Sequence, residues 1–364
     1  RRRFSHIIVF AAVLLWAVAE LTMVESASAQ AGATATIELP PGFAVTEIAG
    51  LNFPTDMAFL PTGELIVLEK GTGDGPDGSA RVRLVRDGAL RSQPVMTMPT
   101  NPFGDSGLLG LAIDPGFTDN GHIYIWHATG EASPGWSGES VKRLSRFTVD
   151  RNSLTASLNS EQIILDDVPW WIMHNGGGMA FDEEGRLYLS VGDVTRGETA
   201  QQSDRFTGKV LRIVPTNSGY ALPSDNPYVG DDAGLPEVFS LGLRNPFRLS
   251  YRASDQRIYV ADVGNEAWEE VNLVAPGVNF GWPAREGPCP LNEIFPCDAA
   301  PPSYTDPILF YGHDEDMGAS VTGLDFYEGT EFPPEFHDQL FFADLNLGTI
   351  EVGFLEEDGF EIAP

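Results

Sequence analysis

One hairpin pattern returns along most of the chain: a short apolar strand, a turn rich in Pro, Asp and Gly, and a second apolar strand. Strands separated by tight turns at this density predict antiparallel β-sheets and almost no helix. The second strands begin about 60 to 80 residues apart, against the roughly 40 to 50 residues of a usual propeller blade. We therefore interpret the chain as an all-β propeller whose blades carry long insertions. Five copies are visible, at 54–68, 107–125, 173–193, 245–262 and 321–344.

The number of blades follows from the need to close the ring, because an open ring leaves sheet edges unpaired. Five copies fit either a five-bladed ring or a ring with a further blade beyond residue 364. Unrelated hairpins in a β-sandwich are the alternative. A chain of 364 residues that is 42% hydrophobic can bury the core of one large domain or of two ordinary ones, and its 39 Gly and 27 Pro favour many short strands joined by turns.

The charge balance limits the partners. The chain has 22 Lys and Arg against 52 Asp and Glu, which gives a formal net charge of −30. Nucleic acid and anionic membrane surfaces would be repelled by such a chain, so we expect neither as a partner. A solvated acidic surface accounts for most of the carboxylates, and some of them could be calcium ligands.

The beginning of the chain has the pattern of a secretory signal peptide. Three arginines precede an apolar run at 7–21, and a small-residue stretch follows at 26–31. This order predicts a signal peptide over residues 1–29, with cleavage after Ala29 and the propeller over 34–364. The apolar run is too short to indicate a membrane span. We expect a periplasmic or secreted protein with no membrane span after cleavage.

Two cysteines, Cys289 and Cys297, lie close together in a Pro-rich segment. In an exported protein this spacing predicts one local disulfide that pins a long loop.

The segment 173–193 carries the first candidate for chemistry. His174 is followed by three glycines, a strand, an acidic turn and a second strand that ends before Asp193. An imidazole has a pKa near neutrality, and the glycines allow close approach, so the pattern is typical of a reactive group at the mouth of a hairpin. A hydrogen-bonded structural histidine is the alternative.

Several motifs taken together resemble the glucose/sorbosone dehydrogenase family. The resemblance implies a six-bladed propeller, with the last blade truncated in this chain, and a sugar dehydrogenase that uses pyrroloquinoline quinone (PQQ) and Ca²⁺. It covers about residues 40 to 350. The motifs that carry it are the Gly-Leu-Leu-Gly-Leu-Ala segment at 107–112 with 114–117, His-Asn-Gly-Gly at 174–177, and the segments 208–213, 242–247, 262–264, 269–272 and 279–283.

The resemblance assigns roles to individual residues. It implies that His174 is the general base that removes the proton of a sugar hydroxyl, and that Asp193 orients this histidine. It implies that Arg244 and Asn245 contact the cofactor, where a guanidinium would stabilise an oxyanion that develops on the quinone. A structural arginine and a turn-capping aspartate are the alternative interpretations.

Calcium ligands are also implied by the resemblance. The backbone carbonyls of Gly264 and Asn265 match those that hold the cation beside the quinone. Glu270 and the carbonyl of Phe280 match a second, structural calcium site. Hard oxygen ligands of this kind suit Ca²⁺. A surface charge on a turn is the alternative for Glu270.

The chain departs from the family at positions that touch the bound molecules. Asp105 stands where sugar-oxidising members have Gln, and Met173 stands where they have Asp. The basic residues that hold the PQQ carboxylates have no counterpart that we recognise before Pro364. We count Asp105 with the cofactor-binding residues and expect an altered sugar specificity.

These features favour an exported quinoprotein dehydrogenase that oxidises a hydroxyl of an aldose or related sugar. It would transfer hydride to PQQ and pass electrons to an unidentified acceptor. A non-catalytic ligand-binding propeller is the first alternative, and Asp105 and Met173 favour it. A calcium-dependent lactone hydrolase is the second.

Overall fold

A computed structural model describes residues 39, 43–71, 80–130, 140–293, 296–298, 300–313, 318–356 and 359–362. The chain divides into two compact units, 1–45 and 46–364, and every described strand lies in the second. The expected signal peptide at 1–29 lies outside the described residues. No helix in the described part of the chain is long and apolar enough to cross a membrane.

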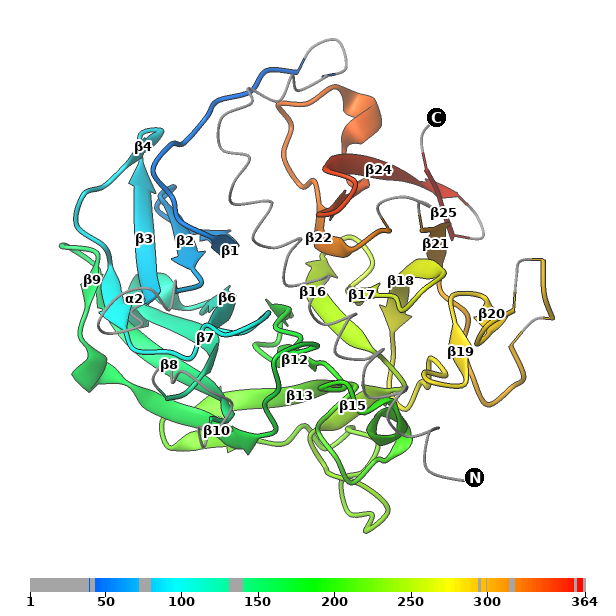
Figure 1. Ribbon diagram of the computed structural model, residues 1–364. Helices are drawn as coiled ribbons and strands as arrows, with labels where there is room; N and C mark the ends of the chain where they lie inside the picture. Colours follow the sequence, from blue (N-terminus) through cyan, green and yellow to red (C-terminus); the bar gives the residue numbers. More distant parts are fainter. Residues whose placement is uncertain are drawn as a thin grey trace, which may run out of the picture. The chain divides into compact units, whose positions relative to one another are not determined.

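Almost every described element is a strand of an antiparallel sheet (Figure 1). Sheet 1 contains β1 (Pro54–Phe59), β2 (Leu65–Glu69), β3 (Ala80–Arg86), β4 (Ala89–Leu90) and β5 (Met96–Met98). Sheet 2 contains β6 (Leu108–Ile113), β7 (His122–Ala128), β8 (Lys142–Asp150), β9 (Thr155–Ala156) and β10 (Gln162–Val168). Sheet 3 contains β11 (Met179–Phe181), β12 (Leu187–Val191), β13 (Lys209–Thr216), β14 (Gly219–Ala221) and β15 (Val238–Leu241).

The later strands form two four-stranded sheets and a small hairpin. Sheet 4 contains β16 (Asn245–Arg252), β17 (Arg257–Val263), β18 (Trp268–Val274) and β21 (Leu309–Gly312). Sheet 5 contains β22 (Val321–Phe326), β23 (Leu340–Asp344), β24 (Thr349–Glu356) and β25 (Gly359–Ile362). The hairpin pairs β19 (Arg285–Glu286) with β20 (Cys289–Pro290). The short helices are α2 (Phe117–Asn120), η1 (Leu158–Ser160), η2 (Gly197–Gln201) and η3 (Pro334–Phe336).

The turn that opens sheet 3 shows how the sequence specifies a hairpin. The Asp182 carboxylate accepts the backbone N–H groups of Glu184 (3.1 Å) and Arg186 (2.9 Å). Gly185 takes a left-handed φ of 76°, which glycine adopts at little cost. The turn therefore joins β11 to β12 in register, with Phe181 opposite Leu187.

Each sheet packs against the next one along the chain. Strand β1 contacts β6, β6 contacts β11, β12 contacts β16, and β16 contacts β22. Four hydrophobic clusters lie between the five sheets, each built from the facing sides of two neighbours. Burial of these apolar faces is the main stabilising term of the fold. The packing confirms the predicted all-β propeller.

The predicted number of six blades is not what the structure shows. Each of the five sequence copies supplies one sheet of four or five strands, and the described residues contain no sixth sheet of that size, only the two-stranded β19–β20 hairpin. The sheets still meet at their inner strands through Arg248 of β16. Its guanidinium donates to the carbonyl of Thr55 in β1 (2.6 Å), pairs with Asp56 (3.0 Å), and reaches the carbonyl of Thr322 in β22 (3.4 Å). One arginine thus links sheets 1, 4 and 5.

The predicted disulfide is confirmed. Cys289 and Cys297 are bonded, and Cys289 belongs to the β19–β20 hairpin. The bond therefore closes a loop that begins on a strand lying next to sheet 4.

Candidate active site

His174 and Asp193 form a buried hydrogen-bonded pair. Nδ1 of His174 lies 2.7 Å from Oδ1 of Asp193, whose side chain is 1% exposed. Asp193 also accepts the backbone N–H of Thr195 (2.7 Å) and the indole N–H of Trp282 (2.8 Å). A carboxylate accepts here, so Nδ1 carries a proton, and in the neutral ring the lone pair is then on Nε2. An imidazole fixed in this tautomer is suited to take a proton at Nε2.

The backbone around His174 is held in an uncommon conformation. His174 has a left-handed φ of 57°, which costs free energy for a residue with a side chain. Its carbonyl accepts the N–H of Val194 (3.2 Å), and a Cβ at Gly192 would come within 2.1 Å of that carbonyl. The N–H of Gly176 donates to the side-chain oxygen of Asn245 (3.1 Å). The loop is thus fastened on both sides of the histidine.

Asp105 lies against the same loop. One oxygen accepts the backbone N–H of His174 (2.7 Å), and the other accepts the side-chain amide of Asn175. Burial raises the pKa of Asp105, and the nearby charges of His174 and Lys142 partly offset this. The residue predicted to bind the cofactor therefore contacts the backbone of His174.

Lys142 is a member of this region that the sequence did not reveal. Its side chain is fully buried at the start of β8, and Nζ donates to the hydroxyl of Ser106 (3.1 Å). Burial lowers the pKa of Lys142 to about 7, although the charge of Asp105 acts in the opposite direction. Its burial and its hydrogen bond to Ser106, which lies 36 positions earlier in the chain, are what distinguish it from a surface lysine.

Arg244 is buried and incompletely paired. Its guanidinium donates to the carbonyl of Val263 (3.0 Å) and, at 3.4 Å, to the side chain of Asn265. It lies 5.6 Å from the ring centre of Trp282, the residue that also binds Asp193. Its Nε has no partner among the described residues. Trp282 therefore connects the guanidinium with the histidine pair, a link that sequence patterns do not carry.

Asn245 and Glu270 join this network through Asp262. Asp262 accepts the backbone N–H groups of Arg244 (2.9 Å) and Asn245 (2.7 Å), and it lies opposite Glu270 in the β17–β18 ladder. Burial, followed by the charges of Glu286 and Glu269, raises the pKa of Glu270 to about 7. Burial and the charge of Glu270 raise the pKa of Asp262 well above its usual range.

The predicted calcium ligands are divided between two places. Gly264 and Asn265 follow β17, and no described residue donates a hydrogen bond to either of their carbonyls. The Glu270 carboxylate accepts from the backbone of Gly287 and from the amide of Asn272 (2.9 Å). Phe280 is buried in the cluster between sheets 3 and 4, and its N–H binds the carbonyl of Leu241.

Side chains alone do not form a metal centre in this region. Within the part of the chain that the structure describes, no group of three or more His, Cys, Asp and Glu is arranged to hold a metal ion. A site built mainly from backbone carbonyls, such as those of Gly264 and Asn265, is a different kind of site, and Ca²⁺ readily accepts such ligands.

Comparison with known proteins places the chain in a family. A family model described as glucose/sorbosone dehydrogenase matches residues 51–360. The chain belongs to this family. The aldose sugar dehydrogenase YliI of Escherichia coli is 26% identical, over 81% of this chain and 76% of its own length. The HIPL2 protein of Arabidopsis thaliana is 28% identical over 66% of this chain, but only 42% of that relative's length is spanned.

A solved structure extends the comparison to the fold. The PQQ-bound form of the aldose sugar dehydrogenase of Streptomyces coelicolor is 25% identical, with a TM-score of 0.69. The match covers 90% of this chain and 86% of that one. Members of the family thus include sugar dehydrogenases of the same architecture.

Proposed function

We propose that this chain is an exported quinoprotein dehydrogenase that oxidises a hydroxyl of an aldose or related sugar. The observation that carries the proposal is the His174–Asp193 pair, which Trp282 connects to the buried and incompletely paired Arg244. Family membership and the sugar dehydrogenases among the relatives support it.

His174 takes the hydroxyl proton at Nε2 while the carbinol C–H leaves as hydride. Asp193 keeps Nδ1 protonated and stabilises the imidazolium that results. Arg244 is buried, where a positive charge acts strongly, and it would hold an oxygen of the quinone and stabilise negative charge there. PQQ, when bound, supplies the hydride acceptor, and an unidentified partner then receives the electrons.

Arg244 and the carbonyls of Gly264 and Asn265 fit a quinone oxygen with a calcium ion beside it. Arg244 has an unpaired Nε, and the Gly264 and Asn265 carbonyls have no donor among the described residues. The guanidinium would hold a quinone oxygen and the two carbonyls would bind Ca²⁺. Glu270 and the Phe280 carbonyl would contribute to a second calcium site, where the cation would offset the burial and the repulsion by Glu286 and Glu269 that together raise the pKa of Glu270.

The test is a titration of the calcium-loaded protein with PQQ, followed by quinone absorbance and then by addition of a panel of aldoses and other polyols. Saturable binding with sugar-dependent reduction, lost in His174→Ala, is the expected result. A folded, calcium-replete sample that binds no PQQ would overturn the proposal.

Met173 favours a second candidate function. It directly precedes His174, at a position where an acidic side chain was expected to contact sugar. A non-catalytic propeller would recognise its ligand at the same end of the sheets without oxidising it. Binding of a sugar by the PQQ-free protein, with unchanged affinity in His174→Ala, would support this function.

A further inference from the structure

A single carboxylate oxygen organises the loop after β17. Oε1 of Glu286 accepts four successive backbone N–H groups, those of residues 265 to 268, at 2.7, 2.8, 2.9 and 3.2 Å. Glu286 is 4% exposed. A concave run of amides of this kind is an anion-binding arrangement, and here the anion belongs to the chain itself. Hydrogen bonds to a charged acceptor are stronger than those between neutral groups.

The position of Glu286 is itself fixed. It lies on β19, opposite Cys289 of β20, and Cys289 is bonded to Cys297. The preceding residue, Arg285, pairs with Asp306 (2.9 Å). The carboxylate is thus presented by a hairpin that is tied on both sides, so the loop is shaped by the hairpin rather than the reverse.

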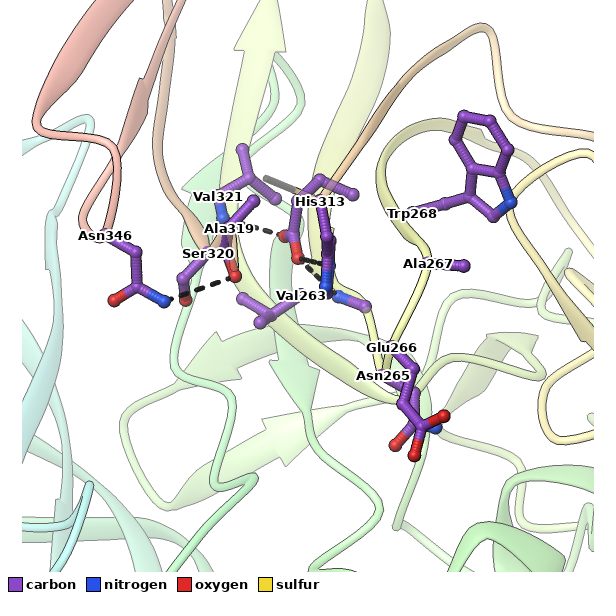
Figure 2. Close-up of polar contacts among 12 residues, drawn as sticks. Val263, Asn265, Glu266, Ala267, Trp268, His313, Ala319, Ser320, Val321 and Asn346 are labelled. Atoms are coloured by element: carbon purple, nitrogen blue, oxygen red, sulfur yellow. Dashed lines mark hydrogen bonds and ion pairs between the residues drawn. The ribbon is translucent and has the colours of Figure 1, made fainter. Parts of the chain in front are cut away.

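A second carboxylate holds the beginning of the same loop. Glu269 is fully buried, and its Oε1 accepts the N–H of Gly264 (3.2 Å) and binds Nε2 of His313 (2.8 Å). Figure 2 shows the segment from Asn265 to Trp268 beside His313. The backbone N–H of His313 donates to the carbonyl of Ala267 (3.0 Å). Both carboxylates bind amides of the loop.

In this arrangement the carbonyls of Gly264 and Asn265 accept no hydrogen bond from the described residues. The side chain of Asn265, in contrast, contacts Arg244. We propose that Glu286 is the positioning residue of this loop: by holding four amides on one side, it presents the carbonyls of Gly264 and Asn265 to a divalent cation. The inference rests on the proposed function, because that function calls for a cation beside Arg244.

The affinity of this loop for a cation depends on how well its carbonyls are preorganised. Two neutral carbonyls bind Ca²⁺ usefully only if they are already directed at one point, since ordering a free loop would consume much of the binding free energy. Glu286→Gln keeps an acceptor oxygen but loses the charge that strengthens four hydrogen bonds. Glu286→Ala loses the acceptor altogether, so the two variants should weaken cation binding in that order.

The experiment measures Ca²⁺ affinity by calorimetry and Tb³⁺ binding by luminescence sensitised by nearby tryptophans, on the full chain without PQQ. We expect affinity to fall about threefold in Glu286→Gln and at least tenfold in Glu286→Ala. Glu293→Ala is the control, because this glutamate follows the same hairpin and is exposed to solvent. Melting temperatures in EDTA show whether each variant folds.

Two results would overturn the inference. One is an affinity in Glu286→Ala, or in Glu286→Gln if the alanine variant does not fold, that equals the wild-type value. The other is a wild-type protein that binds neither Ca²⁺ nor Tb³⁺. The dehydrogenase proposal is judged separately, by the loss of sugar-dependent PQQ reduction in His174→Ala, so the two can fail independently.

Discussion

Asp193 and the acidic residues around Glu270 are buried carboxylates that differ in the charges of their neighbours. Asp193 receives hydrogen bonds from a backbone amide, an indole and an imidazole. Asp262 and Glu270 face each other across the β17–β18 ladder, with Glu286 and Glu269 nearby. The other carboxylates accept hydrogen bonds as well, but they also lie beside one another, so that burial and like charge together raise the pKa of Asp262 and of Glu270.

Carboxylates in one fold can thus serve two different purposes, according to the groups that surround them. A carboxylate with three donors stays in place as an acceptor, which suits the orientation of a base. Carboxylates that raise one another's pKa bind protons readily, and a cation could replace those protons. Under the proposed function, the histidine side (His174 and Asp193) would move a proton, and the acidic side (Asp262, Glu269, Glu270 and Glu286) would hold a positive charge.

The largest expected effect comes from removing the acceptor of the histidine side. Asp193→Asn can offer an N–H to Nδ1, which would then need to be the unprotonated nitrogen, and Nε2 would carry the proton. We expect kcat for sugar oxidation to fall on the order of 100-fold, the scale of general base catalysis, with little change in KM. Steady-state rates with the PQQ-loaded protein measure this. Asp119→Asn, at an exposed site, serves as the control, and a fall below threefold in Asp193→Asn would contradict the comparison.

A smaller effect is expected in the stability of the acidic side. The pKa of Glu270 is raised to about 7 in the folded protein, from the ordinary 4.5 of the unfolded chain. The folded state thus binds the proton more tightly, and the free energy of unfolding must fall as pH rises from about 4.5 to 7. In EDTA we expect a loss on the order of 2 kcal/mol between pH 5 and pH 7.5, measured by urea denaturation.

Two variants and added Ca²⁺ test whether Glu270 causes this pH dependence. Glu270→Gln should flatten the pH dependence because its side chain cannot ionise, whereas Glu183→Gln at an exposed position should keep it. Added Ca²⁺ should restore stability at pH 7.5 if it takes the place of the protons. An unchanged slope in Glu270→Gln would show that the charges of the acidic side do not interact as described.

The sequence predicted well what depends on local pattern. The five hairpin copies correspond to five sheets, as in β11–β12 with its Asp182 turn, and the two cysteines are bonded as expected. His174 and Asp193 were matched through motifs, and their side chains do meet, while their part in catalysis stays a prediction. The number of blades was wrong because it came from the resemblance and not from the five copies themselves.

What the sequence could not predict depends on contacts between distant segments. Asp105 binds the backbone of His174 across 69 positions, and Trp282 binds Asp193 across 89. Glu286 reaches four amides some twenty residues earlier only because of the hairpin that carries it. Such pairings leave no periodic signal in a single sequence, since no spacing rule relates the partners.

The smallest effect concerns Asp105, which tests whether the histidine side extends beyond Asp193. Asp105→Asn keeps one acceptor oxygen, so one of the bonds to the N–H of His174 and to Asn175 is lost. A lost hydrogen bond of this kind costs about 1.4 kcal/mol, which corresponds to about tenfold in kcat/KM.

The pattern across sugars decides how Asp105 acts. Because Asp105 contacts the histidine backbone, its loss should lower kcat/KM by a similar factor for every aldose in a panel, with exposed Asp204→Asn as the control. A fall confined to one sugar would show that Asp105 contacts substrate instead, as its place in the sequence motif first indicated. In that case the hydrogen bond from Val194, the close approach of Gly192 and the bond between Gly176 and Asn245 would suffice to hold the left-handed backbone of His174.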